Sequence, residues 1–127
     1  MQYFKLTRRS LMVLSASLAA GALPVSRALA HAHLKASVPA AESTVAAPAS
    51  LRLTFSEGIS LKFSGAAVTG PDKAAVTLGA ATLDPKDPAT LIVPVSGTLQ
   101  PGKYTVSWHA LSNDGHKTTG GYVFTVK

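Results

Sequence analysis

The strongest strand signal in this sequence is the stretch Tyr104-Thr105-Val106-Ser107-Trp108-His109. Large apolar side chains alternate there with polar ones, and successive side chains of a β-strand point to opposite faces of a sheet. The stretch therefore predicts a half-buried strand whose apolar residues face a core, with His109 as a surface histidine on the opposite face. Turn-forming residues at 100–102 and 113–115 bound this strand on its two sides.

Shorter segments of the same kind lie on both sides of this strand. Apolar alternation or apolar runs predict further strands at 34–38, 51–55, 61–69, 91–93 and 122–126, with at best a brief strand at 76–78. Residues 40–48 and 84–88 are rich in proline and small or polar residues, and we expect them to be loops. No convincing amphipathic helix follows residue 30. About seven short strands predict an all-β, immunoglobulin-like Greek-key sandwich.

The first 30 residues have the features of a cleavable export signal. Basic residues precede an apolar run at 11–23, and Ala28-Leu29-Ala30 is typical of a cleavage site. The apolar run is too short to span a membrane. We therefore expect a signal peptide at 1–30, cleavage after Ala30, and one exported domain at 31–127. The pair Arg8-Arg9 is compatible with both the twin-arginine and the general secretory route.

Removal of this segment changes the charge of the protein. The chain has 12 basic and 6 acidic residues, and four of the basic ones but none of the acidic ones precede residue 31, so the net charge falls from +6 to +2. The remaining lysines are scattered, which argues against a nucleic-acid partner. Cysteine is absent. Any metal site must therefore use nitrogen and oxygen donors.

Cleavage after Ala30 would make His31 the amino terminus. Its α-amine and imidazole could then chelate one metal ion, and nitrogen donors in a tetragonal arrangement suit Cu(II). Asp114 and His116 are candidate partners, because residues two apart in an extended segment point to the same side and Gly115 lets the backbone bend. On spacing alone, an ordinary turn is the competing interpretation of these three residues.

His33 permits a different geometry. A free terminus with histidine at the third place can bind Cu(II) or Ni(II) through the amine, two deprotonated backbone amides and that imidazole. Such a site needs no folded protein. Whether His33 is a ligand therefore stays open at the level of the sequence.

Several motifs together resemble the CopC/PcoC family of periplasmic copper-resistance proteins over residues 31–127. They are a His-Ala-His-Leu start after the signal, Leu-Thr-Phe-Ser-Glu at 53–57, Gly-Lys-Tyr-Thr-Val at 102–106, Ser-Trp at 107–108, Asp-Gly-His at 114–116 and Tyr-Val-Phe-Thr-Val-Lys at 122–127. Each piece alone is common, whereas the ordered set is specific. The resemblance implies an immunoglobulin-like sandwich that binds copper.

The resemblance also implies a site and a role. The amine and ring of His31, with Asp114 and His116, would hold one Cu(II) ion per mature chain, and Glu57 is a less secure ligand or near neighbour. The expected protein is a periplasmic, monomeric, non-enzymatic carrier that sequesters copper, with a CopD-type inner-membrane transporter as a candidate recipient. Delivery and storage remain alternatives.

The chain differs from some members of that family in its methionine content. Those members have a methionine-rich Cu(I) region in the middle of the chain, where thioether sulfur suits the softer ion. Here the two methionines are Met1 and Met12, both in the signal segment. We therefore predict one Cu(II) site and no methionine-based Cu(I) site.

Two other classes of protein compete with a copper carrier. A copper-dependent oxidative enzyme could use the same amine-and-imidazole chelate on a β-sandwich, although this chain shows no aromatic row to hold a polymer. A non-metal interaction domain of immunoglobulin type would make every histidine incidental. Tighter binding of Cu(II) by the folded, cleaved protein than by a peptide of residues 31–36 discriminates the other two classes from this last one.

Overall fold

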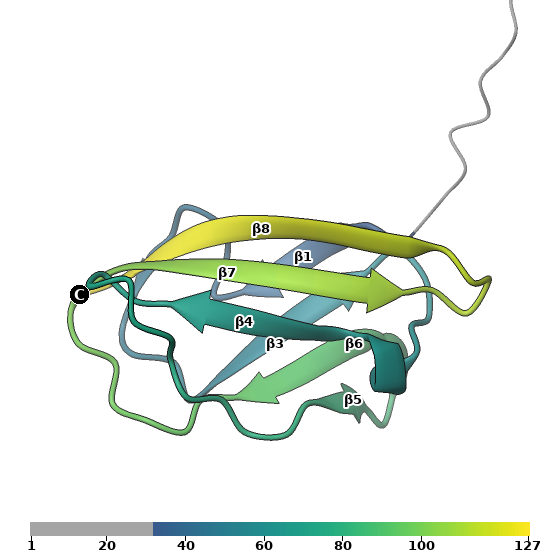
Figure 1. Cartoon of the computed structure of the whole chain (residues 1–127), viewed down its shortest axis with the longest axis horizontal. Coiled ribbons are helices and arrows are strands. Elements are labelled where there is room, and N and C mark those ends of the chain that lie inside the picture. The colour runs from purple at the N-terminus through teal and green to yellow at the C-terminus, as the bar shows by residue number, and fades with distance from the viewer. Residues whose placement is uncertain (1–31) are drawn as a thin grey trace, which may run out of the picture.

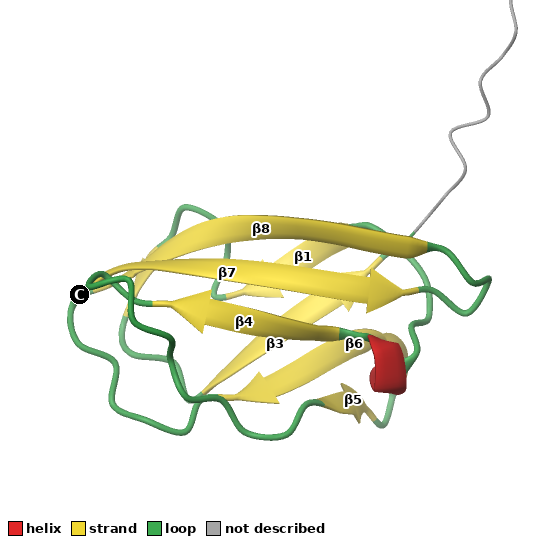
Figure 2. Ribbon diagram, in the orientation of Figure 1, coloured by secondary structure: helices red, strands yellow, loops and turns green. Residues whose placement is uncertain are grey.

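A computed structural model describes residues 32–127, which form two four-stranded sheets packed face to face (Figures 1 and 2). The first sheet has the order β1 (Leu34–Val38), β3 (Ser50–Phe55), β6 (Asp87–Pro94) and β5 (Thr82–Asp84). The second has the order β2 (Thr44–Val45), β8 (Lys117–Val126), β7 (Gly102–Leu111) and β4 (Gly65–Thr69). A single 3-10 turn, η1 (Leu61–Phe63), precedes β4 in this described part. The predicted all-β sandwich is confirmed, with eight strands rather than about seven.

The stretch at 104–109 lies within β7, which pairs with β8 from Gly102↔Val126 to Leu111↔Lys117. Burial alternates along β7, so Trp108 is 8% exposed while His109 is exposed, as expected. The Trp108 ring meets Phe55 of the other sheet edge-on, with ring centroids 5.1 Å apart. Because burial of one large apolar side chain contributes about 1.5–3 kcal/mol, these inward-facing residues hold the two sheets together.

The structure differs from the sequence prediction mainly at sheet edges. β2 and β5 were expected to be loop or unassigned, and Asp87 and Pro88 belong to β6 rather than to a loop. The predicted strand at 61–69 divides into η1 and β4, and residues 76–78 contribute only an isolated bridge, Leu78↔Val95. A strand of two residues, Thr44 and Val45, shows no periodicity in the sequence, so only pairing with β8 defines it.

The connections gather at two ends of the sandwich (Figure 1). One end holds residues 32–33, 56–58 and the 112–116 turn between β7 and β8, and we call it the histidine end. The opposite end, where Figure 1 marks the C-terminus, holds residues 70–77 and 97–101 beside Tyr104, and we call it the tyrosine end. Within residues 32–127 there is no helix of the length and apolar character needed to cross a membrane. The predicted signal peptide and His31 lie outside the described residues.

Candidate metal centre

The 112–116 turn brings two predicted ligands together. Gly115 has a φ of +92°, a left-handed conformation that glycine adopts without steric cost. The turn is closed by the Gly115 amide, which donates to the Ser112 carbonyl at 2.9 Å, and by the Ser112 amide, which donates to the His116 carbonyl at 2.9 Å. As a result, Nδ1 of His116 lies 3.0 Å from Oδ1 of Asp114.

The Asp114 carboxylate is stabilised in its charged form. It accepts hydrogen bonds from the Ser112 hydroxyl and from the His116 amide, the latter at 3.1 Å. These bonds, the Ser112 hydroxyl first, lower the pKa of Asp114 to about 2. Both side chains remain accessible, at 45% exposed for Asp114 and 51% for His116. The turn therefore presents an ionised oxygen donor beside an imidazole nitrogen.

The start of the described chain is anchored beside this turn. The Ala32 side chain is fully buried, and the Ala32 carbonyl accepts a hydrogen bond from the Thr118 hydroxyl at 2.6 Å. The His33 amide donates to Oγ of Ser56 at 3.0 Å, and the Ser56 amide donates to the His33 carbonyl at 2.9 Å. Since Thr118 follows His116 by two residues, the segment at 32–33 is held at the same end of the sandwich as the candidate ligands.

Glu57 lies between two of these tethered points. Its neighbour Ser56 is bonded to His33, and the carbonyl of its other neighbour, Gly58, accepts from the Asn113 amide at 3.0 Å. One carboxylate oxygen, Oε1, is buried and has no hydrogen-bond partner among the described residues. An unpaired buried carboxylate oxygen is costly. Glu57 would therefore gain from a cation or a proton donor placed next to it.

The predicted set is not assembled by the described residues alone. Between residues 32 and 127, no three His, Asp or Glu side chains form a group that could hold a metal ion. The structure brings Asp114 and His116 together and anchors the backbone of His33. It leaves His31 outside the described residues and places His109 on the outer face of β7, opposite Thr119 of β8.

Three residues at this end were not singled out from the sequence. Ser112 is 2% exposed and holds the Asp114 carboxylate, Thr118 holds the Ala32 carbonyl, and Ser56 holds the His33 amide. Serine two residues before aspartate is a recognisable turn motif, because its hydroxyl can bond to the local backbone. Nothing local identifies Ser56 or Thr118, since each bonds across the fold.

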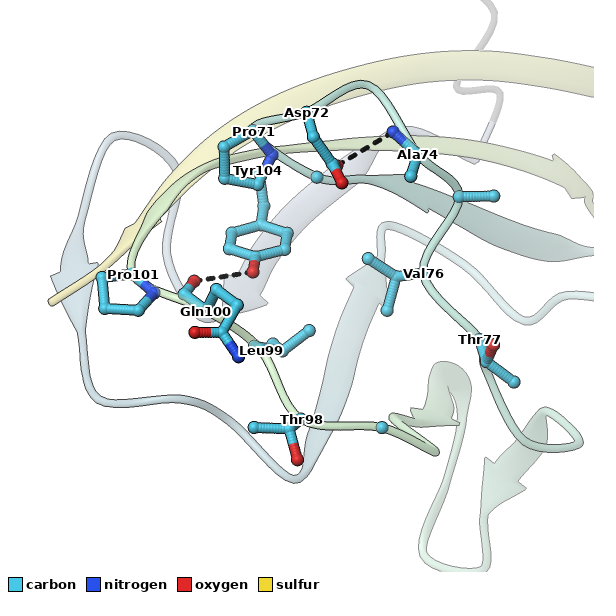
Figure 3. A pocket seen from close by; sticks show the side chains of 13 residues that line it. Pro71, Asp72, Ala74, Val76, Thr77, Thr98, Leu99, Gln100, Pro101 and Tyr104 are labelled. Carbon is cyan, nitrogen blue, oxygen red and sulfur yellow. Dashed lines mark hydrogen bonds between the residues drawn. The ribbon is translucent and has the colours of Figure 1, made fainter.

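A hollow with a volume of about 450 Å³ lies elsewhere, at the tyrosine end (Figure 3). The Tyr104 hydroxyl donates to the Gln100 carbonyl at 2.7 Å, and the Asp72 carboxylate accepts from the Ala74 amide at 3.0 Å. Its remaining walls are largely apolar and include Val76 and Leu99. None of the predicted ligands lines this hollow, so its volume does not mark the metal centre.

Comparison with known proteins identifies relatives of this chain and of its fold. Residues 34–127 match the sequence model of the CopC domain. The chain is 50% identical over 99 residues to protein YobA of Escherichia coli (strain K12), covering 77% of this chain and 80% of that protein. It is 43% identical over 106 residues to copper resistance protein C of Escherichia coli, covering 79% and 84%. The crystal structure of PcoC, a methionine-rich copper resistance protein from Escherichia coli, superposes with a TM-score of 0.69 at 41% identity, covering 77% of this chain and 100% of PcoC.

Proposed function

Because the chain belongs to the CopC domain family, we propose that it is a copper-resistance protein that binds one Cu(II) ion in the periplasm. The observation that carries the proposal is the pairing of Asp114 and His116 beside the anchored segment at 32–33. The donors are oxygen and nitrogen, which suit Cu(II) better than Cu(I). The chain has no methionine after Met12, so a thioether site is not part of the proposal.

The proposed ligands are Asp114, His116 and the amine and imidazole of His31 after cleavage behind Ala30. Support for His31 comes from its covalent neighbour, because the Thr118 hydroxyl and the buried side chain of Ala32 anchor that neighbour at the histidine end. Glu57 is a further candidate, supported by its buried Oε1, which has no hydrogen-bond partner within residues 32–127.

Hydrogen bonds at the start of the domain argue against a site built on His33. Metal binding at the third position requires the backbone nitrogens of Ala32 and His33, yet the His33 amide already donates to Ser56. Wrapping residues 31–33 around an ion would also disrupt the bonds of the Ala32 and His33 carbonyls. Loss of these three hydrogen bonds, at about 1 kcal/mol each, would lower the metal affinity of such a site about a hundredfold. We therefore place His33 outside the ligand set.

Titration of two forms of the protein with Cu(II) and a competing chelator tests the proposal. We expect the form that begins at His31 to bind about one equivalent, and a form that retains Ala30 to bind at least about a hundredfold more weakly, because it lacks the histidine α-amine. The ordinary pKa of an α-amine is about 7.7–8.0, so affinity should also fall as the pH is lowered. Equal affinity of the two forms would refute the amine chelate.

Export and cleavage are tested separately. We expect N-terminal sequencing of the protein from a periplasmic fraction to begin at His31. A first residue before His31 in the periplasmic protein would contradict the proposed chelate. Replacement of the Arg8-Arg9 pair by lysines distinguishes the two export routes, because only twin-arginine export depends on that pair.

The proposed role is binding rather than catalysis, with a CopD-type inner-membrane transporter as the recipient of the copper. Both statements rest on the family. Transfer from the loaded protein to membranes with and without such a transporter distinguishes delivery from storage. Oxidised oligosaccharides in an assay with reductant and polysaccharide would instead support the enzymatic alternative.

A further inference from the structure

A second, smaller hollow adjoins the histidine end on the outer face of the β8-β7-β4 sheet. It has a volume of about 340 Å³ and is built from η1, the last residues of β7 and the first residues of β8. Figures 1 and 2 show η1 at the same end of the molecule as the turn between β7 and β8. The side chains that matter for the argument are Lys62, Phe63, His109, Lys117 and Thr119.

The apolar wall of this hollow is exposed to solvent. Phe63 is 53% exposed and Leu61, on the same turn, is 40% exposed. Neither side chain belongs to the buried core. The ammonium group of Lys62 lies 5.4 Å from the centroid of the Phe63 ring, a distance typical of a cation–π contact. A positive charge is therefore held directly beside an exposed aromatic ring.

A glycine next to the hollow leaves space for the imidazole that lines it. Gly65 of β4 pairs with His109 of β7, and a Cβ built on Gly65 would lie 3.1 Å from Cε1 of His109. The glycine therefore gives the imidazole room to lie against β4. The rings of Phe63 and His109 both line the hollow.

The lysine and carboxylate side chains of the protein are unequally distributed at this hollow. Lys62 and Lys117 line it, and none of the six acidic residues of the chain does. Thr118 also lines the hollow, and its hydroxyl is the group that holds the Ala32 carbonyl. The hollow therefore shares one residue with the anchor of the domain start.

We propose that this hollow docks a protein partner that presents a carboxylate beside an apolar side chain. The carboxylate would pair with Lys62 or Lys117, and the apolar side chain would cover Phe63. A protein segment fits better than an anionic membrane surface, because the site is concave and its two lysines fall short of the roughly four to eight basic residues of a lipid-recognising cluster. The use of this surface in copper transfer rests on the proposed function, whereas docking itself does not.

The test is a titration of the isotope-labelled exported protein with a hexapeptide that alternates glutamate and phenylalanine, followed by amide chemical shifts. We expect the shifts to concentrate at residues 62–63, 109 and 117–119. The double variant Lys62→Glu/Lys117→Glu should weaken binding about tenfold, and Phe63→Ala about fivefold. The matched controls are Lys103→Glu, an exposed lysine near the other end of β7, and Val38→Ala, at an apolar residue that is 61% exposed; both should change binding less than about twofold.

Other results would overturn the proposal. One is chemical-shift changes that spread over the whole surface or are absent from the hollow. A second is equal affinity for a control peptide with lysine in place of glutamate. A third is chemical-shift changes at the hollow that phosphatidylglycerol vesicles cause and the peptide does not. A Cu(II) titration of Phe63→Ala separates the two proposals. Normal copper binding with lost peptide binding supports docking, whereas peptide binding by a protein that fails to bind Cu(II) refutes only the proposed function.

Discussion

The two ends of the sandwich differ in what their loops contain and how those loops are held. The tyrosine end has the larger hollow, about 450 Å³, but its Tyr104 hydroxyl and Asp72 carboxylate are engaged in local hydrogen bonds. The histidine end presents an ionised carboxylate, Asp114, and an imidazole, His116, that are about half exposed. The proposed metal site therefore lies where donor atoms are accessible and not at the hollow of the tyrosine end.

The ends also differ in the reach of their hydrogen bonds. The bond from Tyr104 to Gln100 spans four residues of sequence, whereas the bond from Thr118 to Ala32 spans 86. A long-range bond at the histidine end ties the start of the domain to β8. This bond implies that the proposed copper site depends on the folded domain.

The largest expected effect is on copper affinity at the histidine end. We expect His116→Ala to lower the affinity for Cu(II) at least about a hundredfold, because it removes one of the proposed imidazole ligands. His109→Ala is the matched control, since His109 lies on the outer face of β7, and its affinity should stay within about twofold of the parent. Chelator competition measures both. A larger loss from His109→Ala than from His116→Ala would contradict the proposed ligand set.

A smaller effect is expected when the long-range anchor is removed. Thr118→Val keeps the shape of the side chain but leaves the Ala32 carbonyl without its donor, which should cost about 1–3 kcal/mol of the free energy of unfolding. Copper affinity should fall about tenfold, because His31 would be less well positioned. Thr119→Val, on the outward-facing side of β8, serves as the control in urea denaturation and in the copper titration. Unchanged copper affinity in Thr118→Val would mean that the anchor does not position the ligand.

At the tyrosine end, stability and copper binding should separate. Tyr104→Phe removes the hydroxyl that donates to the Gln100 carbonyl and should cost about 1 kcal/mol in the free energy of unfolding. Its affinity for Cu(II) should equal that of the parent protein, because this end holds none of the proposed ligands. A reduced copper affinity in Tyr104→Phe would break the distinction between the two ends.

The smallest expected effect is a change in the pKa of Asp114. The Ser112 hydroxyl is the main cause that lowers the pKa of Asp114 to about 2, so Ser112→Ala should raise this pKa toward the ordinary value of 3.8. Because the pKa is lower in the folded protein than in the unfolded chain, the stabilising contribution is present above about pH 4 and is lost as the pH falls toward 2. In Ser112→Ala the pKa of Asp114 should differ less between the folded and the unfolded state. The pH range over which the stabilising contribution is lost should therefore be narrower. Carboxyl carbon shifts of Asp114 in the metal-free protein measure the change, and an unchanged midpoint would contradict the role of Ser112.

Much of the fold was predictable from local patterns. The alternation at 104–109 predicted β7, and similar patterns predicted β3 and β8, because inward-facing apolar side chains repeat with period two. β2 and β5 were not predictable in this way. They have two and three residues, too few for any period, and pairing with longer strands defines them.

The candidate site also has a part that local sequence patterns predict and a part that they do not. Asp114, Gly115 and His116 were identifiable because a turn sequence places them within three residues, and their approach to 3.0 Å follows from that local geometry. The family resemblance seen in the motifs is confirmed by the match over residues 34–127. The role of His31 stays a prediction, since that residue lies outside the described part of the chain.

The sequence by itself determined the fold class, the family and the chemical types of the proposed ligands, because alternation, turn residues and ordered motifs are properties of neighbouring positions. Only the tertiary structure decided that Thr118 holds Ala32 and that Ser56 holds the His33 amide. It also decided that one buried oxygen of Glu57 has no partner in the described part of the chain. These contacts join residues far apart in the chain. They arise when the two sheets pack, because burial removes water from polar groups and makes each of them depend on whichever partner the fold provides.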